Sequence, residues 1–225
     1  MKRCLVMSVF VGLVVLVAAP VLADDIFPPP WDRSGPDSTY QRWEFPTPDP
    51  MPFPDDAMNP WGVEPATVTP GPGMDWIEVD PEGSGRIGIW PLSGEIEVPV
   101  FNTPPDPLRE KVMWVQVTWR PQPGTTGTPT VTAEADHPDP GQGGMGDIAY
   151  DPVVGDLPDA FGWINSAYEL SLPFNPDMET ITVSGDIDVD ELVIDTICRV
   201  PEPGSIVMVL SAGLVGLIVL IRRRK

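Results

Sequence analysis

Proline restricts the structures open to this chain more than any other residue, because 31 of its 225 residues are proline and 13 of them fall within residues 24–72. Proline at this density blocks helices and interior strands and favours an extended, polyproline-like chain. A free linker rarely carries large aromatic residues, yet this stretch contains Trp31, Tyr40, Trp43, Phe45, Phe53 and Trp61. We therefore expect residues 24–72 to form an extended arm that packs along the body of the protein through its aromatic side chains.

Residues 73–200 show the alternation of side chains that is typical of β-strands. The clearest case is Lys111–Trp119, where odd-numbered residues from Met113 to Trp119 share one apolar face and even-numbered residues share the other. Shorter strands are predicted at 76–79, 86–90, 95–101, 128–135, 164–172, 180–184 and 189–197. No apolar pattern of helical period is long enough for a helix before residue 200. About seven to nine strands joined by Gly and Pro turns predict an all-β fold, a single antiparallel β-sandwich that is jelly-roll-like.

The N-terminal residues have the layout of a secretory signal peptide. Lys2 and Arg3 supply a positive start, residues 5–17 form an uncharged apolar run, and small residues precede Asp24. The run is shorter than the roughly 20 residues that a membrane-spanning helix needs. We expect cleavage between Ala23 and Asp24, which would remove the first 23 residues.

The C-terminal residues predict a membrane anchor. Residues 203–221 are 19 positions without a charge, about the length of one bilayer crossing. Arg222, Arg223, Arg224 and Lys225 follow, and such a cluster resists translocation and stays in the cytoplasm. The pattern indicates a stop-transfer transmembrane helix with the body of the protein outside.

The same tail resembles the PEP-CTERM sorting signal. The matching features are the tripeptide Pro201, Glu202 and Pro203, the apolar helix from Ser205 to Ile221, and the terminal Arg cluster. The resemblance implies processing by an exosortase, a transpeptidase-like membrane enzyme of bacteria with diderm envelopes. Such proteins belong to cells that make exopolysaccharide or biofilm matrix. The alternative is a plain single-pass membrane protein.

Two further segments are similar to uncharacterised PEP-CTERM proteins of planctomycete-like bacteria, and this resemblance implies no activity. They are the start of the arm, from Pro29 to Phe45, and the segment Val189–Cys198.

The expected organisation is a signal peptide (1–23), the arm (24–72), the sandwich (73–200) and the sorting signal (201–225). The expected location is the cell envelope, cell surface or extracellular matrix, with the C-terminal helix as a transient or permanent anchor. The expected processing partners are signal peptidase and an exosortase-type enzyme.

The body of the protein is strongly acidic. All but one of the 33 Asp and Glu residues lie within residues 24–200, against seven Lys and Arg, so the net charge of this part is near −25. Phosphate backbones and anionic lipid surfaces would be repelled, which excludes nucleic acid as a partner. An acidic surface keeps an exported protein soluble, and it can also collect calcium outside cells. We expect no cofactor, and calcium is the alternative that the acidic composition leaves open.

The run Asp186, Asp188 and Asp190 begins like an EF-hand loop. An EF-hand requires Gly at the sixth position and Glu at the twelfth, where this chain has Glu191 and Ile197. The EF-hand match therefore fails. On a strand the three carboxylates would share one face. Two interpretations remain, a solvated strand edge that discourages sheet association and a calcium site of another kind.

Few residues offer metal-binding or catalytic chemistry. Cys198 is the only cysteine after residue 23 and His137 is the only histidine, so neither an intramolecular disulfide nor a Cys/His zinc site can form. No G-x-S-x-G elbow frames a serine, and no Gly-rich loop has a strand-to-helix context. We expect the chain not to be an enzyme.

Tryptophan is the remaining unusual feature, with eight residues. Trp114 and Trp119 point to opposite faces of the predicted strand, so only one of them can face the core. Trp114 either meets the arm or forms an exposed platform on which a sugar ring stacks.

The leading hypothesis is a non-catalytic surface or extracellular-matrix protein that is linked to exopolysaccharide or biofilm. The second hypothesis is a carbohydrate-binding module, with or without calcium, that acts on exopolysaccharide. The third and more distant hypothesis is a polysaccharide hydrolase on the same fold, although no carboxylate pair is singled out.

Overall fold

The computed structural model describes residues 25–139, 145–150 and 152–200. The predicted signal peptide, its cleavage site at Ala23 and Asp24, and the predicted sorting signal lie outside these residues. Within the described ranges, no helix is long and apolar enough to cross a membrane.

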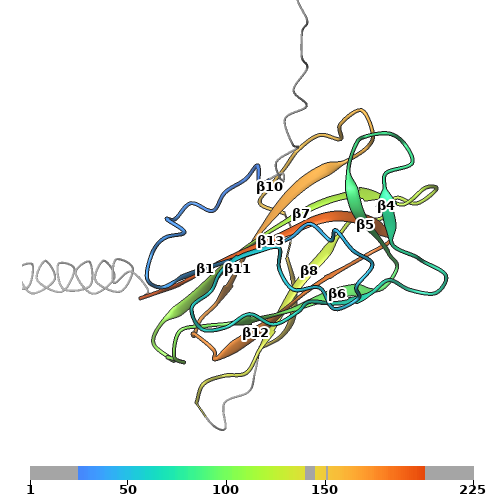
Figure 1. Ribbon diagram of the computed structural model, residues 1–225. Coiled ribbons are helices and arrows are strands. Elements are labelled where there is room, and N and C mark those ends of the chain that lie inside the picture. Colours follow the sequence, from blue (N-terminus) through green and yellow to red (C-terminus); the bar gives the residue numbers. More distant parts are fainter. Residues whose placement is uncertain (1–24, 140–144, 151, 201–225) are drawn as a thin grey trace, which may run out of the picture.

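The described residues form two antiparallel sheets that pack face to face as a β-sandwich (Figure 1). The larger sheet has the order β10-β11-β7-β13-β1-β2, with β5 beside β13 and β4 beside β5. The smaller sheet has the order β3-β6-β12-β8-β9. The strands of the larger sheet are β1 (Ser38–Trp43), β2 (Asp56–Met58), β4 (Ile77–Val79), β5 (Ile87–Leu92), β7 (Glu110–Pro121), β10 (Val154–Gly155), β11 (Ile164–Leu172) and β13 (Ile187–Arg199). Those of the smaller sheet are β3 (Thr67–Thr69), β6 (Glu95–Phe101), β8 (Thr130–Ala135), β9 (Met145–Tyr150) and β12 (Met178–Ser184).

Successive strands cross repeatedly between the two layers. The chain passes from β6 in the smaller sheet to β7 in the larger one and returns for β8 and β9. It then crosses to the larger sheet for β10 and β11, to the smaller for β12 and back to the larger for β13. The longest strands, β7 and β13, pair along almost their whole length at the centre of the larger sheet. A bulge between Val189 and Glu191 interrupts their register.

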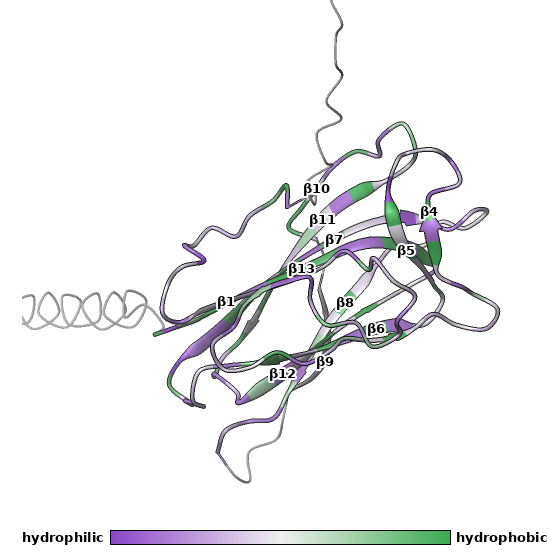
Figure 2. Ribbon diagram, viewed as in Figure 1, coloured by the Kyte–Doolittle hydropathy of each residue, from purple (hydrophilic) through white to green (hydrophobic). Residues whose placement is uncertain are grey.

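The core lies between the sheets and confirms the predicted two-faced pattern of β7. Met113, Val115, Val117 and Trp119 belong to the core cluster, while Trp114 lies on the opposite face of the strand. Figure 2 shows hydrophobic and hydrophilic stretches succeeding each other along both sheets, as expected when each strand turns one face to the core.

The proline-rich segment contributes strands to both sheets and aromatic side chains to the core. Its strand β1 pairs with β13 on one side and with β2 on the other, and Trp43 and Phe45 are fully buried core residues. The alternating prolines act as acceptors, because the carbonyls of Pro50 and Pro52 receive the amides of Val68 and Ala66 at 2.8 and 3.0 Å. A proline lacks an N–H but keeps its carbonyl, so this run suits an edge that accepts hydrogen bonds.

Candidate functional site

Three residues singled out from the sequence lie on the face of the larger sheet that points away from the core. Trp114 is on β7, and Asp188 and Asp190 are on β13. All three are buried, with exposed fractions of 9%, 3% and 9%. This outer face is therefore covered, and two groups of residues cover it.

Residues 25–33 form the first cover, which lies over Trp114. The Trp114 Nε1 donates to the Phe27 carbonyl at 2.6 Å, and the Phe27 amide donates to Gln116 Oε1 at 3.0 Å. Gln116 Nε2 also donates to Asp25 Oδ1 at 2.7 Å. With residues 25–33 lying over it, Trp114 presents no open indole face to a sugar ring.

Arg33 fastens the same segment to the sheet. Its guanidinium donates to both carboxylate oxygens of Asp195, at 2.5 and 2.7 Å, and also pairs with Asp25. It lies 4.6 Å from the centre of the Tyr40 ring. Burial is the largest influence on Asp195 and raises its pKa to about 6, although Arg33 acts in the opposite direction.

Replacement of Asp195 by Asn should remove a pH-dependent loss of stability. The folded state holds the Asp195 proton more tightly than the unfolded chain, because the pKa rises from 3.8 to about 6 on folding. This contribution to stability is complete below the unfolded pKa and is lost as pH rises through about 6. The shift corresponds to about 3 kcal/mol. Urea unfolding between about pH 4 and 7 should show wild type losing up to this amount relative to D195N.

A second variant checks the direction of the Arg33 effect. Because Arg33 lowers the pKa of Asp195, Arg33→Met should move the loss of stability to a higher pH. A difference between wild type and D195N that stays constant with pH would contradict the assignment of the titration to Asp195.

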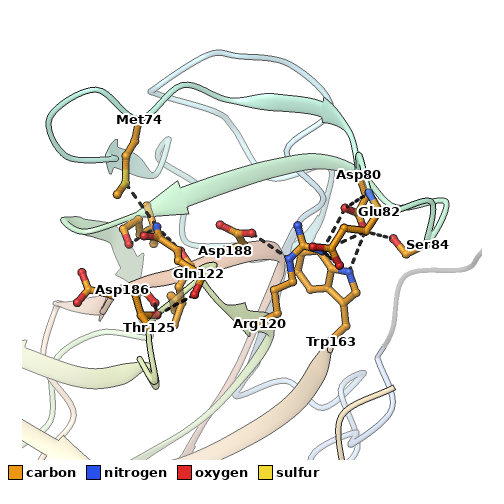
Figure 3. Close-up of polar contacts among 12 residues, drawn as sticks. Met74, Asp80, Glu82, Ser84, Arg120, Gln122, Thr125, Trp163, Asp186 and Asp188 are labelled. Carbon is orange, nitrogen blue, oxygen red and sulfur yellow. Dashed lines mark hydrogen bonds and ion pairs between the residues drawn. The ribbon is translucent and has the colours of Figure 1, made fainter. Parts of the chain in front are cut away.

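The second cover consists of Arg120 and four residues around it, here called the Arg120 cluster: Asp80, Glu82, Arg120, Trp163 and Asp188 (Figure 3). Arg120 is on β7, directly opposite Asp188 on β13. Its nitrogens lie 2.9 Å from Asp188 Oδ2, 3.1 Å from Asp80 Oδ1 and 3.3 Å from Glu82 Oε2. The guanidinium carbon also lies 4.6 Å from the centre of the Trp163 ring.

The turn that begins at Asp80 supplies most of the acidic side of this cluster. The Trp163 Nε1 donates to Asp80 Oδ2 at 3.2 Å, and the Ser84 hydroxyl and Glu82 amide also donate to Asp80. Burial would raise the pKa of Asp80, but these hydrogen bonds and Arg120 hold the pKa below its ordinary value. For Asp188 burial prevails and raises the pKa, against the pull of Arg120.

Asp188 and Asp190 of the predicted Asp-x-Asp-x-Asp run do not lie at a solvated strand edge. Asp188 and Asp190 lie on a central strand and bind arginines, Asp188 with Arg120 and Asp190 with Arg86. Asp186 is exposed. Among the described residues, no group of three or more His, Cys, Asp or Glu side chains is placed to hold a metal ion. Guanidinium groups are thus the counter-charges of Asp188 and Asp190.

The eight tryptophans all lie within the described residues, and none is exposed. Five are buried and Trp31, Trp61 and Trp76 are half-buried. Trp43, Trp90 and Trp119 belong to the core, and Trp76 packs against it. Trp114 lies under the first cover, and Trp163 is part of the Arg120 cluster. His137 stacks on Phe174 with ring centroids 4.5 Å apart, and its Nδ1 accepts the amide of Asp139.

One end of the core contains polar side chains that sequence reasoning did not single out. Lys111, Glu179, Asn102 and Thr196 are buried together, with exposed fractions of 1%, 0%, 4% and 0%. A signal was present, because Lys111 is in phase with Met113 and Val115 and so must point into the core.

Cys198 lies next to this polar end of the core. Its thiol donates to Asn175 Oδ1 at 2.7 Å and accepts from Thr103 Oγ1 at 3.4 Å. The residue is 3% exposed, so it belongs to the buried structure of the last strand.

A shallow, mostly apolar depression of about 360 Å³ lies beside β1 and β2, lined by Gly35, Pro36, Ser38, Met58, Asn59 and Pro60. It brings together no acid, base or nucleophile beyond the Ser38 hydroxyl, which donates to the Asp32 carbonyl at 3.1 Å.

The described residues have an all-β fold, a β-sandwich. No known family model matches the sequence, and no curated protein is significantly similar to it.

Proposed function

We propose that this protein is a non-catalytic component of the cell surface or extracellular matrix, exported and then sorted through its C-terminal PEP-CTERM signal. The observation that carries the proposal is the order of three features in the tail: Pro201-Glu202-Pro203, an uncharged run and a basic cluster. A link to exopolysaccharide or biofilm matrix is part of the proposal.

Several features of the described residues support this role. The crossing of strands between the two layers supports a jelly-roll assignment, a class that serves in shells and surface recognition. Of the predicted binding residues, Trp114, Asp188 and Asp190 make internal contacts. The body has a net charge near −25, which favours a hydrated, soluble surface outside the cell.

Sorting of the full chain in a host that contains an exosortase tests the proposal. Wild type should reach the cell surface or medium, and its mass should show loss of the tail. Glu202→Ala should stay in the membrane fraction at full length, with surface protein reduced at least about tenfold, because the recognised tripeptide is broken and the stop-transfer helix remains. Immunoblotting of fractions and intact-mass measurement report both effects.

Glu44→Ala is the matched control, since it removes the same charge from a side chain that is 45% exposed. It should be sorted like wild type. Equal surface delivery and processing of E202A and wild type would overturn the sorting proposal. Saturable binding of the purified protein to a polysaccharide panel would instead assign it to carbohydrate recognition, and loss of that binding with chelator would add calcium.

A further inference from the structure

The buried polar end of the core contains an amine, a carboxamide and a carboxyl group in mutual contact. Lys111 is on β7, Asn102 follows β6, and Glu179 is on β12. Lys111 is also the only lysine within residues 24–200. This amine is 1% exposed, so it does not contribute to the solubility of the surface.

The contacts among the three groups are specific. The Lys111 Nζ donates to the Asn102 side-chain carbonyl, and the Asn102 side-chain amide donates to Glu179 Oε2. The Lys111 Nζ lies 3.5 Å from Glu179 Oε1. The Thr196 hydroxyl receives a further hydrogen bond from Nζ at 2.6 Å. The amine thus touches the carbonyl of an amide whose nitrogen touches a carboxyl group.

Burial changes the protonation chemistry of this group. Desolvation raises the pKa of Glu179, although Lys111 and Asn102 act in the opposite direction. In a medium of low dielectric constant, a neutral amine and a neutral acid avoid the desolvation penalty of an ion pair. A proton can pass from the Lys111 ammonium to the Glu179 carboxylate across their contact, which leaves a nucleophilic amine beside an amide carbonyl.

We propose that Lys111 and Asn102 form an intramolecular isopeptide bond, with Glu179 as the acid–base residue that transfers the proton. The Nζ lone pair attacks Asn102 Cγ, and the carbonyl becomes a tetrahedral oxyanion. Glu179, which holds the proton taken from the Lys111 ammonium, gives it to the departing amide nitrogen that it already contacts, and the resulting carboxylate then takes a proton from the attacking nitrogen. The Cγ–Nδ2 bond breaks, an Nζ–Cγ bond forms, and one ammonia molecule leaves. No oxidant, reductant or other co-reactant is needed.

The surroundings suit this reaction. All three groups are in phase with core residues of their strands, Lys111 with Met113, Asn102 with Val100 and Glu179 with Ile181. Bulk water is therefore excluded, and the reacting groups are held in place before reaction. The bond would join the smaller sheet, through β6, to the larger sheet, through β7. This inference is independent of the sorting signal and would stand if the protein had another function.

Intact mass of the purified full chain under denaturing conditions is the direct test. We expect wild type to be lighter than its processed sequence by the mass of one ammonia molecule. Digestion with a protease that cuts after free lysine gives a second readout, because Lys111 is the only lysine between Lys2 and Lys225. The linked chain should resist cleavage after Lys111, and fragmentation should identify a peptide joined through Lys111 and Asn102. Full mass together with cleavage after Lys111 would overturn the proposal.

Two variants assign the roles. Asn102→Ala removes the electrophile and Glu179→Gln removes the acid–base group, so both should keep the ammonia mass and be cut after Lys111. Glu110→Gln is the matched control, because Glu110 precedes Lys111 but pairs with Arg199 at the surface, and it should form the bond like wild type. A folded E179Q protein, with β-sheet circular dichroism, that still loses ammonia would overturn the role of Glu179. If either variant fails to fold, the wild-type mass and digest still decide whether the bond forms.

Discussion

Arg120→Met should lower the free energy of unfolding by roughly 3–5 kcal/mol, because removal of one partner leaves buried carboxylates without a counter-charge. The Arg120 side chain is only 6% exposed, and the side chains of Asp80 and Asp188 that it contacts are 0% and 5% exposed. Methionine fills much of the same space, so the loss reports the charge contacts rather than a cavity. Chemical denaturation of wild type and variant at neutral pH measures the difference.

Arg42→Met provides the matched control. Arg42 is 24% exposed and pairs at 3.3 Å with Glu44, which is 45% exposed. Exposed pairs contribute about 0–1 kcal/mol, so this variant should stay close to wild type. If R120M cost no more than R42M, the Arg120 cluster would be a surface feature, and the cover over this part of the sheet would not depend on it.

Strands were predictable from the sequence where the alternation of neighbouring side chains is enough to identify them. The alternation in Lys111–Trp119 and the run 95–101 predicted β7 and β6, because a side chain on a strand faces the core or faces away from it at every second position. The strands β1, β2 and β3 were missed because prolines surround them, and their partners are supplied by distant residues. β1 pairs with β13, which lies more than a hundred residues further along the chain.

The candidate site shows the same division between local and distant information. The spacing of Asp186, Asp188 and Asp190 predicted that they would share a face, but not what would lie opposite. Arg86 is 104 positions from Asp190 in the sequence, and no local sequence pattern predicts an ion pair between residues so far apart. Asp188 and Asp190 are therefore paired with arginines of the fold, while Asp186 is exposed.

Lys111 illustrates a signal that was present and not used. Its position in phase with Met113 and Val115 placed it on the core face, where an unpaired charge is strongly disfavoured. A charged side chain on the core face therefore predicts a buried polar partner for Lys111. The identity of the partners, Glu179 and Asn102, depended on how β12 and β6 pack against β7, which is a property of the folded sandwich.

Trp43→Ala should cost roughly 3–5 kcal/mol of stability, as expected for truncation of a fully buried tryptophan. Trp43 is 0% exposed, and its Nε1 donates to the Pro52 carbonyl at 3.1 Å. Phe53→Ala is the control, because Phe53 is 63% exposed in the same segment and should change stability by less than about 0.5 kcal/mol. The comparison of the two variants decides whether the proline-rich segment is needed for the stability of the sandwich. A large loss for W43A makes β1 an integral strand, whereas two small losses would mean that the segment detaches without unfolding the sandwich.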